Sequence, residues 1–149
     1  MQATGRSGSS RCDAQPHHPW PDWRNGDTAA LRAHVGWAVE GVLVDVEHGL
    51  WMQGWGERPN NLVEALTAAR SHLSRVPKLV PVFAHRYLPS GRRVYGHPVL
   101  SVHQTDIIIY GTDLANYITN EFADHGEDGW SISDDWNRPP LVAFWGDLV

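Results

Sequence analysis

Apolar residues recur along this chain with two different periods, and the change of period predicts where helices give way to strands. A spacing of three to four residues after Asp27 and Thr28, both suitable N-caps, predicts a helix that Gly41 ends. A second helix is predicted from an Asn60 or Asn61 cap to a point before Pro77. The apolar stripes of these helices are Leu31, Val35, Ala38, Val39 and Val42, then Leu62, Leu66, Ala69 and Leu73.

Alternating apolar residues predict strands in four other places. Val42, Val44 and Val46 predict a short strand directly after the first helix. Residues 79–87 predict a second strand, with turn chemistry at 89–91 and an antiparallel partner at 99–103. Residues 107–110 form another β run, and whether residues 104–106 interrupt it or continue it stays open. A third helix then follows Gly111 with a Thr112 cap, aided by Asp113, and a buried side formed by Leu114, Tyr117, Ile118 and Phe122.

This order of elements predicts a single α+β domain, with a mostly antiparallel or mixed sheet and about three helices packed on it. Residues 28–149 form the predicted domain. Residues 1–27 are poor in aliphatic side chains and predict a flexible N-terminal tail, although Trp20 and Trp23 offer a way to dock it. Residues 124–138 are acidic and loop-like, and residues 141–145 predict an edge strand or a segment that covers the core.

Composition narrows the range of partners and compartments. A net charge of −5 over 149 residues argues against nucleic-acid binding, which requires a basic face. The single cysteine, Cys12, excludes internal disulfides and favours a cytoplasmic protein. No stretch reaches the length of a membrane span, and no motif for a cofactor occurs.

A set of polar residues lies inside the most apolar part of the chain, where polar groups are costly unless they are paired. The set includes His85, Arg86, Gln104 and Asp106. Arg86 and Asp106 can satisfy each other as a buried, bidentate ion pair, which predicts a structural role. A site for a ligand or a partner is the alternative.

The spacing of the candidate residues gives little support for a catalytic site. Asp45, Glu47 and His48, with His85 and Asp106, are metal-ligand types without a known ligand spacing, so no metal is expected. Ser101 has histidine and carboxylate neighbours but lacks the strained elbow of a nucleophilic serine. Phosphate-binding glycine motifs are absent, and no catalytic residue is assigned.

Four segments together resemble one family pattern: WAVEGVLVDVEHGLW with WGERP, PKLVPVFAHRYLP, GHPVLSVHQTDIIIYGTDL and PPLVAFWGDLV. The pattern is similar to bacterial proteins placed with the SUKH superfamily, which also contains regulators of fungal cell-wall synthesis. The resemblance implies a non-enzymatic α+β protein that binds and neutralises a cognate toxin. Its motifs add Trp55 and Arg58 to the candidate partner-binding or structural residues.

A small hydrolase or ligand-binding enzyme that uses a His/Arg/Asp polar pocket is the alternative function. An enzyme needs these groups to converge, whereas a binding protein needs a broad exposed face. The sequence leaves the oligomeric state open.

Overall fold

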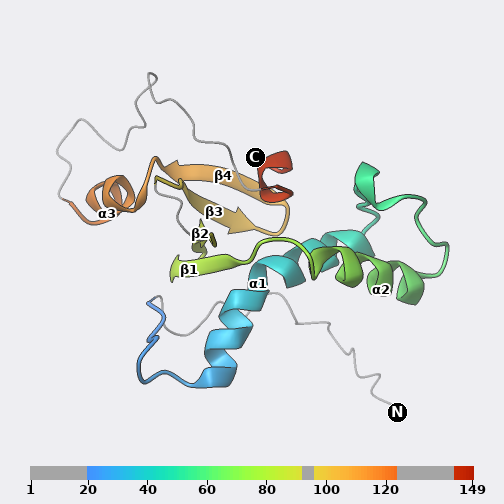
Figure 1. Ribbon diagram of the computed structural model, residues 1–149, viewed down its shortest axis with the longest axis horizontal. Helices are drawn as coiled ribbons and strands as arrows, with labels where there is room; N and C mark the ends of the chain where they lie inside the picture. Colours follow the sequence, from blue (N-terminus) through green and yellow to red (C-terminus); the bar gives the residue numbers. More distant parts are fainter. Residues whose placement is uncertain (1–19, 92–95, 124–142) are drawn as a thin grey trace, which may run out of the picture.

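The computed structural model describes residues 20–91, 96–123 and 143–149. Within these ranges the chain forms a single α+β domain with a four-stranded antiparallel sheet and three α-helices, which confirms the predicted fold class. The strands lie in the order β1-β2-β3-β4, so each pairs with its neighbour in sequence. Figure 1 shows α1 below the sheet, and α2 and α3 at opposite ends of the molecule. The elements are α1 Thr28–Glu47, α2 Leu62–Leu73, β1 Leu79–Phe83, β2 Arg86–Pro89, β3 Val99–His103, β4 Asp106–Gly111 and α3 Leu114–Phe122, with 3-10 turns η1 Gln53–Trp55 and η2 Trp145–Asp147.

Helix α1 begins where the sequence predicts, because the carboxylate of Asp27 accepts a hydrogen bond from the amide of Ala30 at 2.8 Å. The predicted stop at Gly41 and the predicted strand at 42–46 are both wrong, since the helix continues to Glu47. Helical spacing explains the difference, because one buried stripe runs through the whole helix. Its members are His34, Ala38, Val42, Leu43 and Val46.

Gly41 lies within the helix at the point where the β3–β4 turn packs directly against it. A Cβ atom at this position would lie 2.9 Å from the Cα atom of Gln104, so only glycine allows the approach. One turn further along, the Asp45 carboxylate accepts hydrogen bonds from the Thr105 amide at 3.0 Å and from its hydroxyl at 2.6 Å. The end of α1 is therefore fixed to the turn by both packing and hydrogen bonds.

The predicted strand at 79–87 is in fact a hairpin. Ala84 adopts a positive φ of 46°, and the chain reverses so that β1 pairs with β2. The pairing of β2 with β3 is antiparallel, as predicted. Residues 104–105 interrupt the next run rather than continue it, because Gln104 has a φ of 57° and β3 and β4 form a second hairpin.

Helix α2 confirms its prediction, with the Asn61 side chain accepting from the amides of Val63 and Glu64. Close to its end, the buried Trp145 of η2 donates from Nε1 to the carbonyl oxygen of Pro77 at 2.6 Å. Trp145 thus covers the core, which was one of the two roles predicted for the closing segment. The core contains Ala38, Val42, Leu43, Val46, Ala69, Leu73, Leu79, Tyr87, Leu100, Val102, Ile107 and Trp145.

Helix α3 departs from the prediction at its cap and on its surface. Asp113, not Thr112, is the N-cap, and its side chain accepts from the amide of Asn116 at 2.8 Å. Tyr117 is fully buried, as expected. The other members of the predicted buried side remain 39–47% exposed: Leu114, Ile118 and Phe122.

At the N-terminal end of the described chain, Trp20 packs edge-on against Phe83, with ring centroids 4.8 Å apart. It also stacks on Phe122 at 5.3 Å. Trp20 thus makes the docking contact that the sequence left open for the two tail tryptophans, although it stays 50% exposed and Trp23 is 52% exposed. The predictions for 1–19 and 124–142 lie outside the described residues.

Candidate functional site

The two faces of the sheet differ in chemistry, and the difference follows from strand alternation. Tyr87, Leu100 and Val102 point to the face covered by α1 and belong to the core. The alternate residues point to the other face, here called the α3 side: Phe83, Arg86, Ser101, Ile108 and Tyr110. The polar residues that the sequence singled out in the first hairpin therefore lie on the side away from α1.

Arg86 occupies the centre of the α3 side and is only 9% exposed. Its Nη1 donates to the Ser101 hydroxyl at 2.8 Å, across the β2–β3 pair, and also contacts Nε2 of His85. Its guanidinium carbon lies 3.6 Å from the centre of the Tyr110 ring, a close cation–π contact. These contacts hold the guanidinium in one orientation against the sheet.

The predicted ion pair between Arg86 and Asp106 does not form. Strand register is the reason: Arg86 lies opposite Ser101, which lies opposite Ile108, whereas Asp106 pairs with His103 further along β4. Asp106 is exposed to solvent. Within the described residues the ion pair present is Arg70–Glu40, on the exposed surface between α2 and α1.

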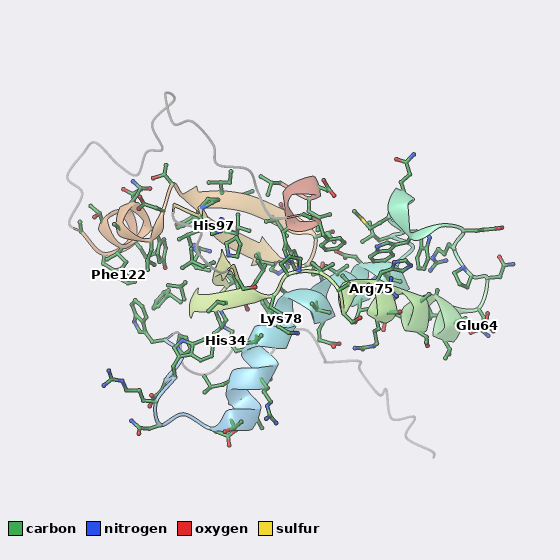
Figure 2. All side chains as sticks on the ribbon, in the orientation of Figure 1. His34, Glu64, Arg75, Lys78, His97 and Phe122 are labelled. Carbon is green, nitrogen blue, oxygen red and sulfur yellow. The ribbon has the colours of Figure 1, made fainter. Side chains whose placement is uncertain are left out.

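Several buried side-chain polar atoms of the described residues have no hydrogen-bond partner. They include Nε of Arg86 itself, Nδ1 of His85, Nδ1 of His97 and the hydroxyl of Tyr117. Figure 2 shows His97 at the same end of the sheet as α3. Burial, with a smaller contribution from Glu121, raises the pKa of Tyr117 to about 12, so its hydroxyl stays protonated.

The environment of His85 favours its neutral form. Burial lowers the pKa of this imidazole, and the positive charge of Arg86 and the neighbouring His103 lower it further, against a weaker opposing effect of Glu121. When Nε2 accepts a hydrogen bond from Arg86, the proton of the neutral ring is on Nδ1. The histidine then presents a buried donor rather than a general base.

The remaining predicted site residues lie elsewhere and are not part of the polar cluster formed by Arg86, His85, Ser101 and Tyr110. Gln104 forms the β3–β4 turn over α1. Trp55 stacks on His72, with ring centroids 5.4 Å apart, and on Phe144 at 6.1 Å. Arg58 donates from Nη2 to the carbonyl oxygen of Val46 at 3.0 Å, close to the end of α1. These contacts place them within the fold near α1 and η1, and Figure 1 shows η1 at the opposite end of the molecule from α3.

Beside the polar cluster, α3 presents an apolar stripe to solvent. Leu114, Ile118 and Phe122 are four residues apart, so they lie on one face of the helix. Ile108 on the adjacent strand is 52% exposed, and Trp20 extends the surface beyond Phe122. We call Leu114, Ile118, Phe122 and Trp20 the α3 stripe. Sequence reasoning found its residues but assigned the three on α3 to the core, since an apolar stripe looks the same in both cases.

Hydrolytic chemistry would need a serine activated by a histidine, or a bound metal ion. In the part of the chain that the structure describes, the Ser101 hydroxyl accepts a hydrogen bond from Arg86. No three His, Cys, Asp or Glu side chains in residues 20–91, 96–123 and 143–149 are placed to hold a metal ion. In the same ranges, no helix combines the length and apolar character required to cross a membrane.

The chain is thus an α+β domain whose sheet has two different faces. One face is covered by α1 and forms the core, and the α3 side carries the buried Arg86 next to the exposed α3 stripe. Comparison with known protein families, curated proteins and solved structures found no match to this chain.

Proposed function

We propose that this chain is a non-enzymatic protein-binding domain that neutralises a cognate bacterial toxin, as its SUKH-like sequence pattern implies. The observation that carries the proposal is the α3 stripe. An isolated exposed leucine is ordinary on a protein surface, but large apolar side chains grouped on one helix face are typical of an interaction site.

Charge specifies the kind of partner. From Asp113 to Phe122 the chain carries the acidic residues Asp113 and Glu121 and no lysine or arginine. The whole chain has a net charge of −5. A basic toxin domain with an apolar patch complements this surface, since charge attraction speeds the encounter while apolar burial maintains the complex. A cytoplasmic location, consistent with one cysteine, belongs to the same proposal.

The polar groups favour binding over the alternative of a hydrolase. Among the described residues, Ser101, His85 and Asp106 do not form a hydrogen-bonded chain, and Ser101 and His85 instead accept from Arg86. A general base needs an accessible acceptor atom, whereas Nε2 of His85 already accepts from Arg86.

The test is capture of partners from the native host with the wild-type chain and with Ile118→Lys, which places a positive charge in the stripe. Val63→Lys is the matched control, because Val63 is 72% exposed on α2, away from α3. We expect the wild type and the control to capture a basic toxin domain, and coexpression to suppress its toxicity. Equal capture by Ile118→Lys, or a captured protein without toxicity, would contradict the proposal.

A further inference from the structure

The segment 20–27 contacts the sheet and α3 through the aromatic side chain of Trp20. This ring meets Phe83, at the end of β1, with centroids 4.8 Å apart and an angle of 64° between the ring planes. It stacks on Phe122, at the end of α3, at 5.3 Å and 27°. Phe83 and Phe122 themselves meet edge to face at 5.3 Å, so the three rings form one cluster. We call Phe83 and Phe122 the ring pair.

The residues that follow Trp20 form a turn that is closed on itself. One carboxylate oxygen of Asp22 accepts from the amides of Arg24 and Asn25, at 3.0 and 2.9 Å. The carbonyl oxygen of Asp22 accepts from the amide of Gly26 at 2.9 Å, just before α1 begins. These hydrogen bonds lie within the segment and do not depend on the Trp20 contact. The turn is therefore an arm that carries Trp20 and is joined to α1.

The contact between Trp20 and the ring pair is only half-buried. Trp20 is 50% exposed and Phe122 is 47% exposed. A ring at the surface gains less from burial than a ring in a core, so release of Trp20 costs little compared with unfolding of the domain. An aromatic side chain that brings a covering protein surface with it would bury more area on the ring pair than Trp20 does. The ring pair is therefore suited to an exchange of Trp20 for such a side chain.

We propose that the ring pair is the docking point for an aromatic side chain of the protein partner, and that Trp20 occupies this point in the free chain. Trp20 itself shows the chemistry of the occupant, since its indole is edge-on against one ring and stacked on the other. The proposal rests on the proposed function, because Phe122 belongs to the α3 stripe. A partner must displace Trp20, so the arm lowers the apparent affinity of the stripe.

The experiment uses the chain of 149 residues and N-acetyltryptophanamide as the probe. Binding is followed by NMR through the backbone amide resonances of Phe83 and Phe122. In Trp20→Ala we expect a saturable shift, with an affinity at least about fivefold higher than in the wild type, because a tethered ring competes at high effective concentration. Trp23→Ala is the matched control, since Trp23 is 52% exposed in the same segment, and it should bind the probe as the wild type does.

A second measurement needs no variant. In the wild type, the Nε1–H resonance of Trp20 should shift as the probe displaces this ring. A Trp20 resonance that stays fixed while the amide of Phe122 shifts would place the probe elsewhere and contradict the proposal. Phe122→Ala in the Trp20→Ala background should abolish the shift of the Phe83 amide, and a shift that persists there has the same meaning.

Three further results would overturn the docking point. One is equal affinity of Trp20→Ala and the wild type for the probe. Another is equal affinity of Trp20→Ala for N-acetylleucinamide, which would show apolar contact without preference for an aromatic ring. The third is a fall of more than about 5 °C in the melting temperature of Trp20→Ala, which would make Trp20 part of the core. Capture of a toxin domain is a separate readout, so failure of the proposed function is distinguished from failure of the docking point.

Discussion

The two faces of the sheet meet opposite physical requirements. On the α1 face, apolar side chains are almost completely buried. The Tyr87 hydroxyl there donates a hydrogen bond to the carbonyl oxygen of His34 at 3.2 Å. On the α3 side, a buried arginine has no counter-ion among the described residues, several buried polar atoms there have no partner within the same residues, and a helix exposes its apolar stripe. A face selected only for stability would not combine these features, because each of them costs free energy.

This contrast indicates that the two faces of the sheet have different roles, the α1 face in stability and the α3 side in binding. The α1 face carries Tyr87, Leu100 and Val102 of the buried hydrophobic core, whose burial stabilises the fold. The α3 side keeps features that are useful for binding. Substitutions on the two faces should therefore separate stability from binding.

The largest effect is expected at Trp145, which is 1% exposed and donates to Pro77. Trp145→Ala should lower the free energy of unfolding by about 3–5 kcal/mol, through lost apolar burial and the cavity left behind. Urea denaturation measures the change. Trp23→Ala, at a 52% exposed tryptophan, is the control and should stay within about 0.5 kcal/mol of the wild type.

Two aspartates test the difference between the faces, with an expected stability change of intermediate size. Asp45→Ala removes the acceptor of two hydrogen bonds from Thr105 and should cost about 1–3 kcal/mol, since a part-buried amide and hydroxyl lose their partner. Asp106→Ala should change stability by less than about 0.5 kcal/mol, because Asp106 is exposed. A large loss of stability in Asp106→Ala would contradict this exposed position and would support the Arg86–Asp106 ion pair that the sequence predicts.

The pH dependence of stability provides a smaller signature of the α3 side. Because the pKa of His85 is lowered in the folded chain, the unfolded chain takes up the proton first as the pH falls. The contribution of His85 is therefore complete above its unfolded pKa of about 6.5 and decreases from there towards its folded pKa. Urea midpoints between pH 7.5 and 5 should fall less steeply in His85→Gln than in the wild type. Parallel profiles would show that this histidine is not buried as described.

The smallest stability effect is expected on the α3 stripe. Ile118→Lys should change the unfolding free energy by no more than about 0.5 kcal/mol, because the side chain is 44% exposed on the surface of α3. Thermal melting is sufficient to measure it. A loss of several kcal/mol would mean that this side chain belongs to a core and not to a binding surface.

Local sequence signals predicted the elements whose ends carry explicit caps. The Asn61 cap and the apolar period gave α2, and the β runs at 99–103 and 107–110 gave strands β3 and β4, but not the hairpin that joins them. Turns without glycine were missed, since Ala84 and Gln104 adopt positive φ values that their residue types rarely favour. The valines at 42–46 were misread because β-branched alternation and a helical stripe coincide there, and contact with the β3–β4 turn decides for the helix.

The site was predictable only in part, for a similar reason. The pattern identified Arg86 as a buried polar residue, which the structure confirms. Its partners depend on strand register across two hairpins, and an error of two residues exchanges Ser101 for His103 as the neighbour across the sheet. Exposure of the α3 stripe depends on what packs over the helix, and the helix sequence does not contain that information.

The most direct test of the division between the two faces is the affinity of the captured toxin domain for Ile118→Lys and Val63→Lys, measured by isothermal titration calorimetry on variants with wild-type melting temperatures. We predict that Ile118→Lys weakens binding at least about 100-fold, or about 2.7 kcal/mol, as expected for an apolar anchor replaced by a repelled charge. Val63→Lys should match the wild type. Equal affinity for all three chains would contradict the assignment of binding to the α3 side.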